Sequence, residues 1–380
     1  MYKIAFFCTA ALLLPSCLLG FTLRTVPYRR GSASVLNVSK VRTSPAPATP
    51  IEVAHIPVLN KASSLPSEDS YDGIVCDMDG VLWLGNEEIL QSIDALNVLK
   101  FGGKSIVFVT NNSAKTKLDI QLKLKNLGYD AHLKDIITSS SVTAEYLKDT
   151  LTKEGKPVTG MKVYMIGNPA LEEELTAVGF EVLKVGEDEP SEMHEDEFSE
   201  VSNSVKNEVV AVVVGIDYGF NYRKLAMGSL YLGRGALFVA TNPDAANKVP
   251  SGAMLPEPGA LIAALELVSG KTAIICGKPS GIIVMHVLAH LKCEPSRVMM
   301  VGDRLDTDIA FASKAGVSSC LVLSGCTSVE EVQKQIDDPV DINKTPDFVA
   351  NDLWDMVSPL ATASLLKLAG ESAPNEDPNI

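Results

Sequence analysis

The sequence has few cysteines, and no two of them are spaced as a CxxC pair. Seven occur in 380 residues, and two of these lie within the first 20 residues, which leaves an odd number of five. This pattern argues against a zinc ribbon and against a disulfide framework. Several of the five lie in apolar runs typical of core strands, so we expect buried free thiols and a reducing compartment. The five are Cys76, Cys276, Cys293, Cys320 and Cys326.

Acidic residues are absent from residues 1–51, whereas the rest of the chain has an excess of them. Residues 1–51 hold six Lys and Arg residues, so subtracting their charge of +6 from the formal net charge of −14 leaves −20 for the remainder. A body this acidic argues against nucleic acid as a partner, because backbone phosphates would find no broad basic surface. A small anion can still bind at a local basic site.

The N-terminal region has no apolar run long enough for a transmembrane helix. The run over residues 4–19 follows Lys3, is broken by Pro15 and ends at Gly20, a small residue typical of a cleavage site. We therefore expect a signal peptide over residues 1–20 and a mature protein with no membrane segment.

Residues 21–66 differ in composition from the body that follows. They begin with Phe21, are rich in Ser, Thr and Ala with scattered Arg and Lys, and continue into a stretch rich in Pro, Ser and Ala. This composition predicts a transit peptide and a linker. A signal peptide joined to such a segment resembles the two-part leader of proteins sent to complex plastids of red-lineage algae. The resemblance implies the plastid stroma as the destination, with the secretory pathway and the cytoplasm as alternatives.

From residue 70 onward, short apolar runs alternate with helical patterns. Apolar runs at 74–76 and 105–109 flank a helical pattern at 88–101, and strand, helix, strand at that spacing predicts a parallel sheet. The fold class is therefore α/β. The acidic stretch 187–200 is predicted to be a mobile surface loop, and 359–380 a C-terminal tail. Further strands are predicted at 162–166, 208–214, 236–240, 272–276, 298–301 and 319–323.

Two carboxylates, Asp77 and Asp79, follow the first apolar run and are followed at once by Gly80. In an open parallel sheet, ligands bind beyond the carboxyl ends of the strands, and a chain that turns at Gly80 can direct both carboxylates there. Two adjacent acids repel each other unless a cation lies between them or one keeps its proton. The pair is a candidate phosphoryl-transfer centre. The alternative is a solvated turn, where Asp and Gly are common.

The next strand end carries hydroxyl and amide side chains. Thr110, Asn111 and Asn112 follow the run at 105–109, and their side chains and backbone N–H groups suit a phosphate oxygen. Asn112 or Ser113 is also expected to cap the helix that follows. Both interpretations can hold together, because a helix N-terminus is itself an anion site.

Two later strand ends add a lysine and three acids. Lys278 lies between Gly and Pro after the run at 272–276, where its ammonium would neutralise a phosphate oxygen. Asp303 follows the run at 298–301 and a glycine, and is best placed to reach a cation shared with the first motif. Asp308 is expected to hold a ligand or a metal-bound water indirectly, and Asp306 to lie at a helix start or on the surface.

In chain order, these four strand ends resemble the motifs of the haloacid dehalogenase-like superfamily. The segments Asp-Met-Asp-Gly-Val-Leu-Trp (77–83), Thr-Asn-Asn-Ser (110–113), Gly-Lys-Pro-Ser (277–280) and Gly-Asp-Arg-Leu-Asp-Thr-Asp-Ile (302–309) are similar to its subgroup of phosphoglycolate and 4-nitrophenyl phosphatases. Pyridoxal phosphatase belongs to the same subgroup. The resemblance covers residues 70–358. It implies a Rossmann-like, doubly wound parallel sheet core with an inserted α/β cap domain.

The resemblance implies a role for each matched residue. Asp77 would be the nucleophile that forms an aspartyl-phosphate, and Asp79 the acid that protonates the leaving oxygen and later activates water. Magnesium would be bound by the Asp77 carboxylate, the Asp79 backbone carbonyl and Asp303. Thr110, Asn111 and Lys278 would hold the phosphoryl oxygens, with a backbone contact from Asn112.

The long interval between the second and third motifs implies the cap. We expect core segments at 70–157 and 271–358, with the cap inserted at 158–270. In the cap, Asn242 and Asp244 match a strand end that faces the core in the family, which implies contact with substrate. An ordinary Asn-Pro-Asp turn is the alternative.

The core motifs fix a reaction on a small phosphorylated metabolite and leave the substrate open. A plastid address favours phosphoglycolate phosphatase, which converts 2-phosphoglycolate to glycolate and phosphate in photorespiration. Pyridoxal phosphatase and a broad-specificity 4-nitrophenyl or sugar phosphatase are the alternatives. A catalytically silent regulatory module is a remote alternative that the complete motif set argues against. The resemblance also suggests a homodimer formed through the cap.

Overall fold

The computed structural model describes residues 70–358, apart from 154, 156, 187–188, 206–207 and 249–252. All of them belong to one compact unit of the chain, Val53–Ile380. The predicted signal peptide (1–20), transit peptide and linker (21–66) and C-terminal tail (359–380) lie outside the described residues.

The core is a six-stranded sheet in which every neighbouring pair is parallel. The first strand is fully buried at an interior position, which its uninterrupted apolar sequence predicts. Because Cys76 is aligned with Phe108 and with Val301, three neighbouring strands end close together. The order of the strands is β15 (Phe348–Ala350), β14 (Ser318–Val322), β13 (Val298–Gly302), β1 (Gly73–Cys76), β4 (Ser105–Thr110) and β5 (Ile136–Thr138).

Helices cover both faces of this sheet. On one face, Ile74, Cys76 and their neighbours pack with α1 (Ser92–Phe101) and α2 (Lys117–Leu127). On the other face, Val75 belongs to a cluster that includes residues of α3 (Ser139–Lys153), α8 (Gly281–Leu291) and α9 (Ala310–Ala315). Alternate residues of β1 thus enter two separate apolar clusters. The predicted doubly wound α/β core is confirmed.

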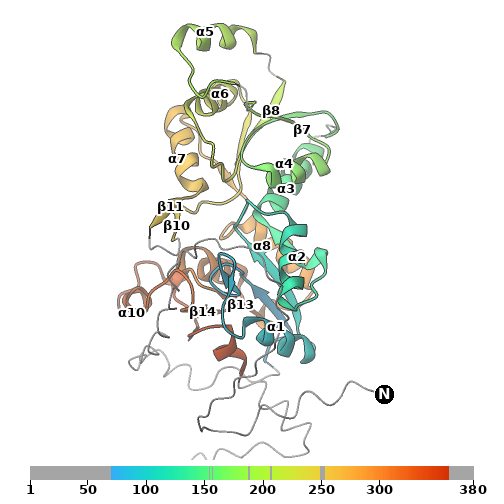
Figure 1. Cartoon of the computed structure of the whole chain (residues 1–380), viewed down its shortest axis with the longest axis vertical. Coiled ribbons are helices and arrows are strands. Elements are labelled where there is room, and N and C mark those ends of the chain that lie inside the picture. The colour runs from blue at the N-terminus through green and yellow to red at the C-terminus, as the bar shows by residue number, and fades with distance from the viewer. Residues whose placement is uncertain are drawn as a thin grey trace, which may run out of the picture. The chain divides into compact units, whose positions relative to one another are not determined.

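The segment between α3 and α8 forms a second parallel sheet, of five strands. In Figure 1, α6 (Tyr222–Gly233) and α7 (Pro258–Ser269) lie on one side of this sheet, with α4 (Pro169–Ala177) on the other. This is the cap that the sequence led us to expect. Its strands, in spatial order, are β12 (Ile274–Ile275), β9 (Leu237–Ala240), β8 (Val209–Val214), β6 (Lys162–Ile166) and β7 (Glu181–Leu183).

The strand predicted at 272–276 differs from expectation in both length and partner. It is reduced to β12, and it pairs with β9 of the cap sheet and not with a core strand. A short apolar run carries no information about which sheet it joins. The predicted core segment 271–358 therefore included this strand. The boundaries 158–270 for the cap remain a proposal, and this pairing puts β12 on the cap side.

Two antiparallel hairpins were not predicted. One joins β2 (Trp83–Leu84) to β3 (Glu87–Glu88) and begins at the last residue of the first motif. The other joins β10 (Ala246–Lys248) to β11 (Met254–Pro256) in the cap. The described part is completed by α10 (Val329–Asp337), the short turns η3 (Leu133–Asp135), η4 (Pro295–Arg297) and η6 (Ile342–Lys344), and the π-helical turn η5 (Leu305–Ile309). Among the described residues, no helix has the length and apolar character needed to span a membrane.

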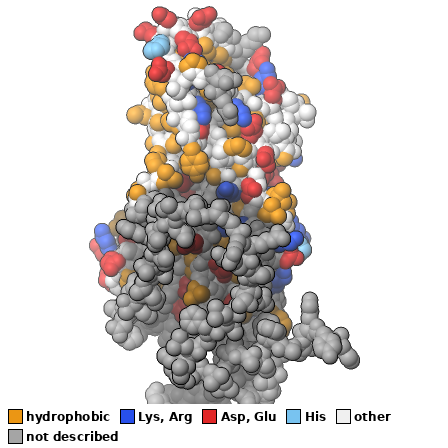
Figure 2. All heavy atoms as spheres, viewed as in Figure 1, with side chains coloured by type: hydrophobic (Ala, Val, Ile, Leu, Met, Phe, Trp, Pro, Cys, Tyr) orange, Lys and Arg blue, Asp and Glu red, His pale blue; other side chains and the backbone are white. Residues whose placement is uncertain are grey.

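The acidic stretch 187–200 is not wholly a loop, and that prediction was wrong from Glu195 onward. A helix, α5 (Glu195–Ser204), begins there with three acids in its first turn, where the helix dipole favours negative charge. The buried side chain of Arg223 fixes the segment through an ion pair of 2.6 Å to Glu197 and a hydrogen bond of 2.8 Å to the Glu192 carbonyl. Figure 2 shows acidic side chains gathered over α5.

Candidate active site

The first aspartate pair lies at the end of β1, where the chain turns. Asp77 is 6% exposed, and its backbone N–H donates to the Val301 carbonyl of the neighbouring strand. Gly80 has a φ of 85°, and a Cβ there would lie 2.3 Å from the Asp303 Oδ2 atom. Glycine is therefore needed twice, for the backbone conformation and for the close approach of Asp303.

A buried lysine links two of the acids. The Nζ atom of Lys278, a residue 1% exposed, lies 2.8 Å from Asp77 Oδ1 and 2.7 Å from Asp308 Oδ1, and it donates to the Val109 carbonyl at 3.1 Å. The other oxygen of Asp308 accepts hydrogen bonds of 3.1 Å from the backbone N–H groups of Asp303 and Arg304. Asp308 thus fixes both the lysine and the turn after β13. Its predicted role toward a ligand or a metal-bound water stays a prediction.

Asp303 is enclosed by backbone on both sides. Its Oδ2 atom accepts a 2.6 Å hydrogen bond from the Cys326 backbone N–H, and a Cβ on Gly325 would lie 2.0 Å from the same oxygen. Its buried Oδ1 atom accepts no hydrogen bond from the described residues. A buried carboxylate oxygen without a partner is costly unless a ligand completes the site.

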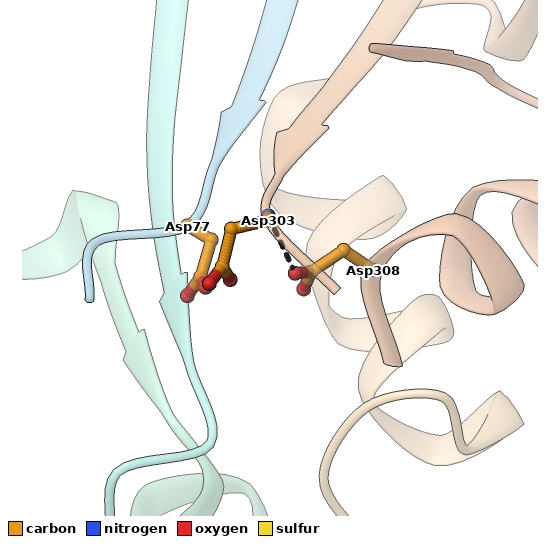
Figure 3. Close-up of side chains that lie close together, drawn as sticks. All are labelled: Asp77, Asp303 and Asp308. Atoms are coloured by element: carbon orange, nitrogen blue, oxygen red, sulfur yellow. Dashed lines mark hydrogen bonds between the residues drawn. The ribbon is translucent and has the colours of Figure 1, made fainter. Parts of the chain in front are cut away.

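The three carboxylates form a compact group. Asp77, Asp303 and Asp308 each place an oxygen within 4.8 Å of the others, and Figure 3 shows the carboxylates of Asp77 and Asp303 side by side. Burial raises the pKa of Asp77 well above its ordinary value; Lys278 opposes the shift, and the other two acids add to it. Burial and Asp308 raise the pKa of Asp303 to about 7. With one lysine for three acids, the site fits a divalent cation.

Asp79 is held by two side chains. The Trp83 indole N–H donates to its Oδ1 atom at 2.9 Å, and the Asn112 amide donates to its Oδ2 atom at 3.3 Å. Its carboxylate is therefore fixed at the cavity wall, as an acid that serves a leaving group requires. The predicted contact of its backbone carbonyl with a metal stays a prediction.

The three residues after β4 have different surroundings. The buried Thr110 hydroxyl oxygen accepts from the Asn112 backbone N–H at 2.9 Å, and the Asn112 side chain accepts from Ala114 N–H at 2.9 Å. The Asn111 side chain instead accepts from the Lys278 backbone N–H at 2.8 Å and donates to the Lys278 carbonyl at 3.0 Å. The amide of Asn111 thus positions the lysine turn, and its backbone N–H is the group that suits a phosphoryl oxygen. Phosphate binding by these residues stays a prediction.

Asn242 and Asp244 connect the cap to the core. The Oδ2 atom of Asp244 accepts from the amides of Asn242 at 2.6 Å and Asn111 at 2.8 Å. Asn242 also accepts from the Thr241 hydroxyl at 2.7 Å, and Asp244 lies 3.5 Å from the Arg304 guanidinium. Both predicted residues line the cavity, with polar atoms engaged in this network. Their predicted contact with substrate is untested.

The site opens into a cavity of about 800 Å³. The predicted residues Asp77, Asp79, Thr110, Lys278 and Asp303 all line it. Sequence reasoning missed the remaining part of its wall, which comes from the first hairpin, the cap and two core loops. These additional lining residues include Trp83, Asn86, Glu87, Asn247, Glu257, Arg304 and Cys326. The only available signal was that Trp83 and Arg304 belong to the motif segments 77–83 and 302–309.

Within the described part, all five cysteines are free thiols. Cys76, Cys276 and Cys320 are buried, as expected, whereas Cys293 and Cys326 are partly exposed. Burial raises the pKa of the Cys76 thiol, with a further contribution from the neighbouring Asp77. A thiol that stays protonated is a poor nucleophile, which argues against a redox role for Cys76 beside the first motif.

Two family models match the chain. One, described as haloacid dehalogenase-like hydrolase, matches residues 74–181, and a second, described as HAD-hydrolase-like, matches residues 275–356. The chain is 34% identical over 295 residues to the glycerol-3-phosphate phosphatase of Gallus gallus, covering 76% of this chain and 92% of that protein. The chain belongs to the haloacid dehalogenase-like hydrolase family.

Plant and bacterial members of the family extend the comparison. The chain is 33% identical over 296 residues to the chloroplastic phosphoglycolate phosphatase 1A of Arabidopsis thaliana, covering 77% of this chain and 78% of that protein. The structure of a glycerol phosphate phosphatase from Mycobacterium tuberculosis, solved with magnesium, superimposes with a TM-score of 0.61 at 27% identity. The match covers 76% of this chain and 77% of that one. This haloacid dehalogenase-like chain is a phosphomonoester hydrolase, as the motifs predicted.

Proposed function

We propose that the chain hydrolyses small phosphate monoesters in two steps through an aspartyl-phosphate on Asp77. An Asp77 oxygen attacks phosphorus and the bond from phosphorus to the ester oxygen breaks, while Asp79 gives its proton to that oxygen. Asp79 then takes a proton from a water molecule, whose oxygen attacks phosphorus and releases phosphate from Asp77. The observation that supports this most is the position of Asp77, buried at a cavity wall 2.8 Å from Lys278 Nζ.

Magnesium is the proposed cofactor. Asp77, Asp303 and the Asp79 backbone carbonyl would hold it, and the buried Asp303 Oδ1 atom without a protein partner fits this role. When bound, magnesium supplies positive charge that offsets the phosphoryl and carboxylate charges. The chain's own Lys278 orients and neutralises Asp77, and the Thr110 hydroxyl and Asn111 N–H are proposed to orient the phosphoryl group.

The proposed substrate is 2-phosphoglycolate, and the proposed location is the plastid stroma. The predicted two-part leader and the Arabidopsis thaliana relative support this choice. Glycerol 3-phosphate is the second candidate, because the Gallus gallus relative acts on it by name. Pyridoxal phosphate and 4-nitrophenyl phosphate remain alternatives. A homodimer is also proposed, and its test is the mass of the chain in solution.

A substrate panel tests the substrate. The full chain is assayed for phosphate release from 2-phosphoglycolate, glycerol 3-phosphate, pyridoxal phosphate and 4-nitrophenyl phosphate, with and without magnesium. We expect the highest kcat/KM for 2-phosphoglycolate and no turnover without the metal. A preference for pyridoxal phosphate would contradict the proposal that 2-phosphoglycolate is the substrate. The absence of any magnesium-dependent phosphate release would favour a catalytically silent binding module.

Replacing the proposed nucleophile tests the mechanism. Asp77→Asn keeps the size of the side chain, and Lys278 keeps its ion pair of 2.7 Å with Asp308, so we expect a folded protein whose turnover falls by at least about 1,000-fold. Phosphate release and a thermal melt measure the two effects. Asp94→Asn, an exposed change in α1, is the matched control. Substantial turnover by Asp77→Asn would exclude the covalent route.

A further inference from the structure

One acidic side chain in the cavity has no part in the mechanism described above. Glu257 lines the cavity and immediately precedes α7, and its backbone N–H donates to the Ala245 carbonyl at 3.1 Å. Its carboxylate makes no capping bond to the helix, and no described residue forms a hydrogen bond or ion pair with it. Glu257 is therefore a partly buried carboxylate with its acceptor capacity available to a molecule in the cavity.

The charged groups around Glu257 are already engaged with one another. The Arg304 guanidinium lies 3.2 Å from both oxygens of Asp306 and 3.5 Å from Asp244 Oδ1, and it reaches the Ala246 carbonyl at 3.5 Å. The Oδ2 atom of Asp244 already accepts two amide hydrogen bonds. Arg304 is thus shared among several acceptors, which leaves Glu257 as the acid at this part of the wall with no direct partner.

The local charge balance makes this part of the cavity unfavourable for another anion. Burial raises the pKa of Glu257 to about 7, Asp244 and Asp79 add to the shift, and Arg304 opposes it. The phenol of Tyr218, a largely exposed residue, also interacts with Glu257: partial desolvation of the phenol and the charge of Glu257 raise its pKa. Above pH 7 the carboxylate is ionised and repels a second carboxylate, whereas it accepts a hydrogen bond from a hydroxyl group.

We propose that Glu257 is a specificity-determining residue that favours phosphate monoesters whose leaving group carries a hydroxyl over those whose leaving group carries a carboxylate. The inference rests on the proposed function and deepens it, because it names the feature of the leaving group that the cap distinguishes. Glu257 lowers the hydrolysis of 2-phosphoglycolate relative to that of glycerol 3-phosphate. Which of the two esters has the higher kcat/KM is set by the whole site and is decided by the substrate panel.

The test compares kcat/KM for these two substrates in the full chain and in Glu257→Gln, with magnesium at about pH 8. Removing the charge is expected to raise the ratio of 2-phosphoglycolate to glycerol 3-phosphate hydrolysis by about tenfold. 4-Nitrophenyl phosphate, whose leaving group has neither feature, should change by less than about twofold. Glu192→Gln, at a side chain 81% exposed in the cap, is the control for loss of one acid and should leave the ratio unchanged.

A second variant keeps the test decisive if Glu257→Gln alters the fold. Glu257→Asp retains the charge and should stay close to the wild-type ratio, with melting temperatures reported for both variants. An unchanged ratio in Glu257→Gln, or equal changes in the Gln and Asp variants, would overturn the inference and leave the phosphatase intact. A wild-type chain that hydrolyses none of the three esters would instead overturn the proposed function.

Discussion

At the residue scale, Asp303 depends on two neighbours that have no side chain. Gly80 and Gly325 both approach its carboxylate so closely that a Cβ on either would lie within 2.3 Å of Oδ2. The two glycines enclose the Oδ2 atom, and this atom also accepts a hydrogen bond from the Cys326 N–H. Both contacts hold the carboxylate in one orientation. Glycine at these positions fixes the orientation of the Asp303 carboxylate. Its Oδ1 atom then remains without a hydrogen bond from the described residues, as a candidate ligand for a cation.

Gly80→Ala should therefore damage the site more than backbone strain alone predicts. The variant must displace Asp303 and place alanine at a φ of 85°, so we expect a loss of about 3 kcal/mol in unfolding free energy and at least a 100-fold loss of kcat/KM. Gly103→Ala is the matched control, with a φ of 74° and nothing within 4 Å of the added Cβ. Denaturant titration and kinetics compare the two. Equal losses in both variants would show that strain alone is responsible.

At the element scale, the ends of β4 and β9 are joined across the boundary between core and cap. Asn111 follows β4, Asp244 follows β9, and their 2.8 Å hydrogen bond joins residues 133 positions apart. Asn111 also binds both backbone groups of Lys278, so the lysine turn, the core strand and the cap strand share one amide side chain. The position of the cap and the position of the lysine are thus set together.

Asp244→Ala should change catalysis as well as stability. It leaves the amides of Asn111 and Asn242 without one acceptor, which we expect to lower the free energy of unfolding by about 2 kcal/mol and kcat/KM by about tenfold or more. Asp217→Ala is the matched control, because Asp217 is equally buried but binds Lys224 within the cap. Its kcat/KM should stay within about twofold. A tenfold loss of kcat/KM in both variants would mean that the hydrogen bond between Asp244 and Asn111 is not the cause of the loss.

At the scale of the whole molecule, the balance of buried charge connects folding to metal binding. A cation bound only by the folded chain stabilises it by about 2.7 kcal/mol at a hundredfold excess over Kd, which we expect to raise the melting temperature by roughly 5 °C. Asp303→Asn should lose most of this rise, because it removes the partnerless carboxylate oxygen. Thermal melts with magnesium and with a chelator measure it. An equal rise in Asp303→Asn would contradict the proposed metal site.

The sequence was sufficient for the core and for the residues that gather at its edge. Apolar runs predict β1, β4 and β13, which pair as parallel neighbours. Because parallel strands end at one edge of a sheet, the sequence also predicts that Asp77, Thr110 and Asp303 lie near one another. Lys278 lies beside Asp77 even though the strand before it belongs to the other sheet.

The rest depends on contacts between distant segments. A short strand such as β12 has no pattern that reveals its sheet, and no local signal announces that Asn111 will bind Asp244 or that Glu257 will line the cavity. The helix α5 was missed because an acidic composition is common to exposed helices and loops, and the buried contacts of Arg223 decide between them.

The pairing of β12 with β9 sets a rule for building chimeras within the family. The cap sheet continues to Ile275, and hydrogen bonds from Cys276 and Gly277 to the β9 end carry it to the residue before Lys278. A crossover placed at residue 270 would separate β12 from the other strands of the cap sheet. Lys278 would then follow a strand that pairs with the β9 of a different protein. A donor cap should therefore be exchanged together with its lysine turn, with the junction placed at the start of α8.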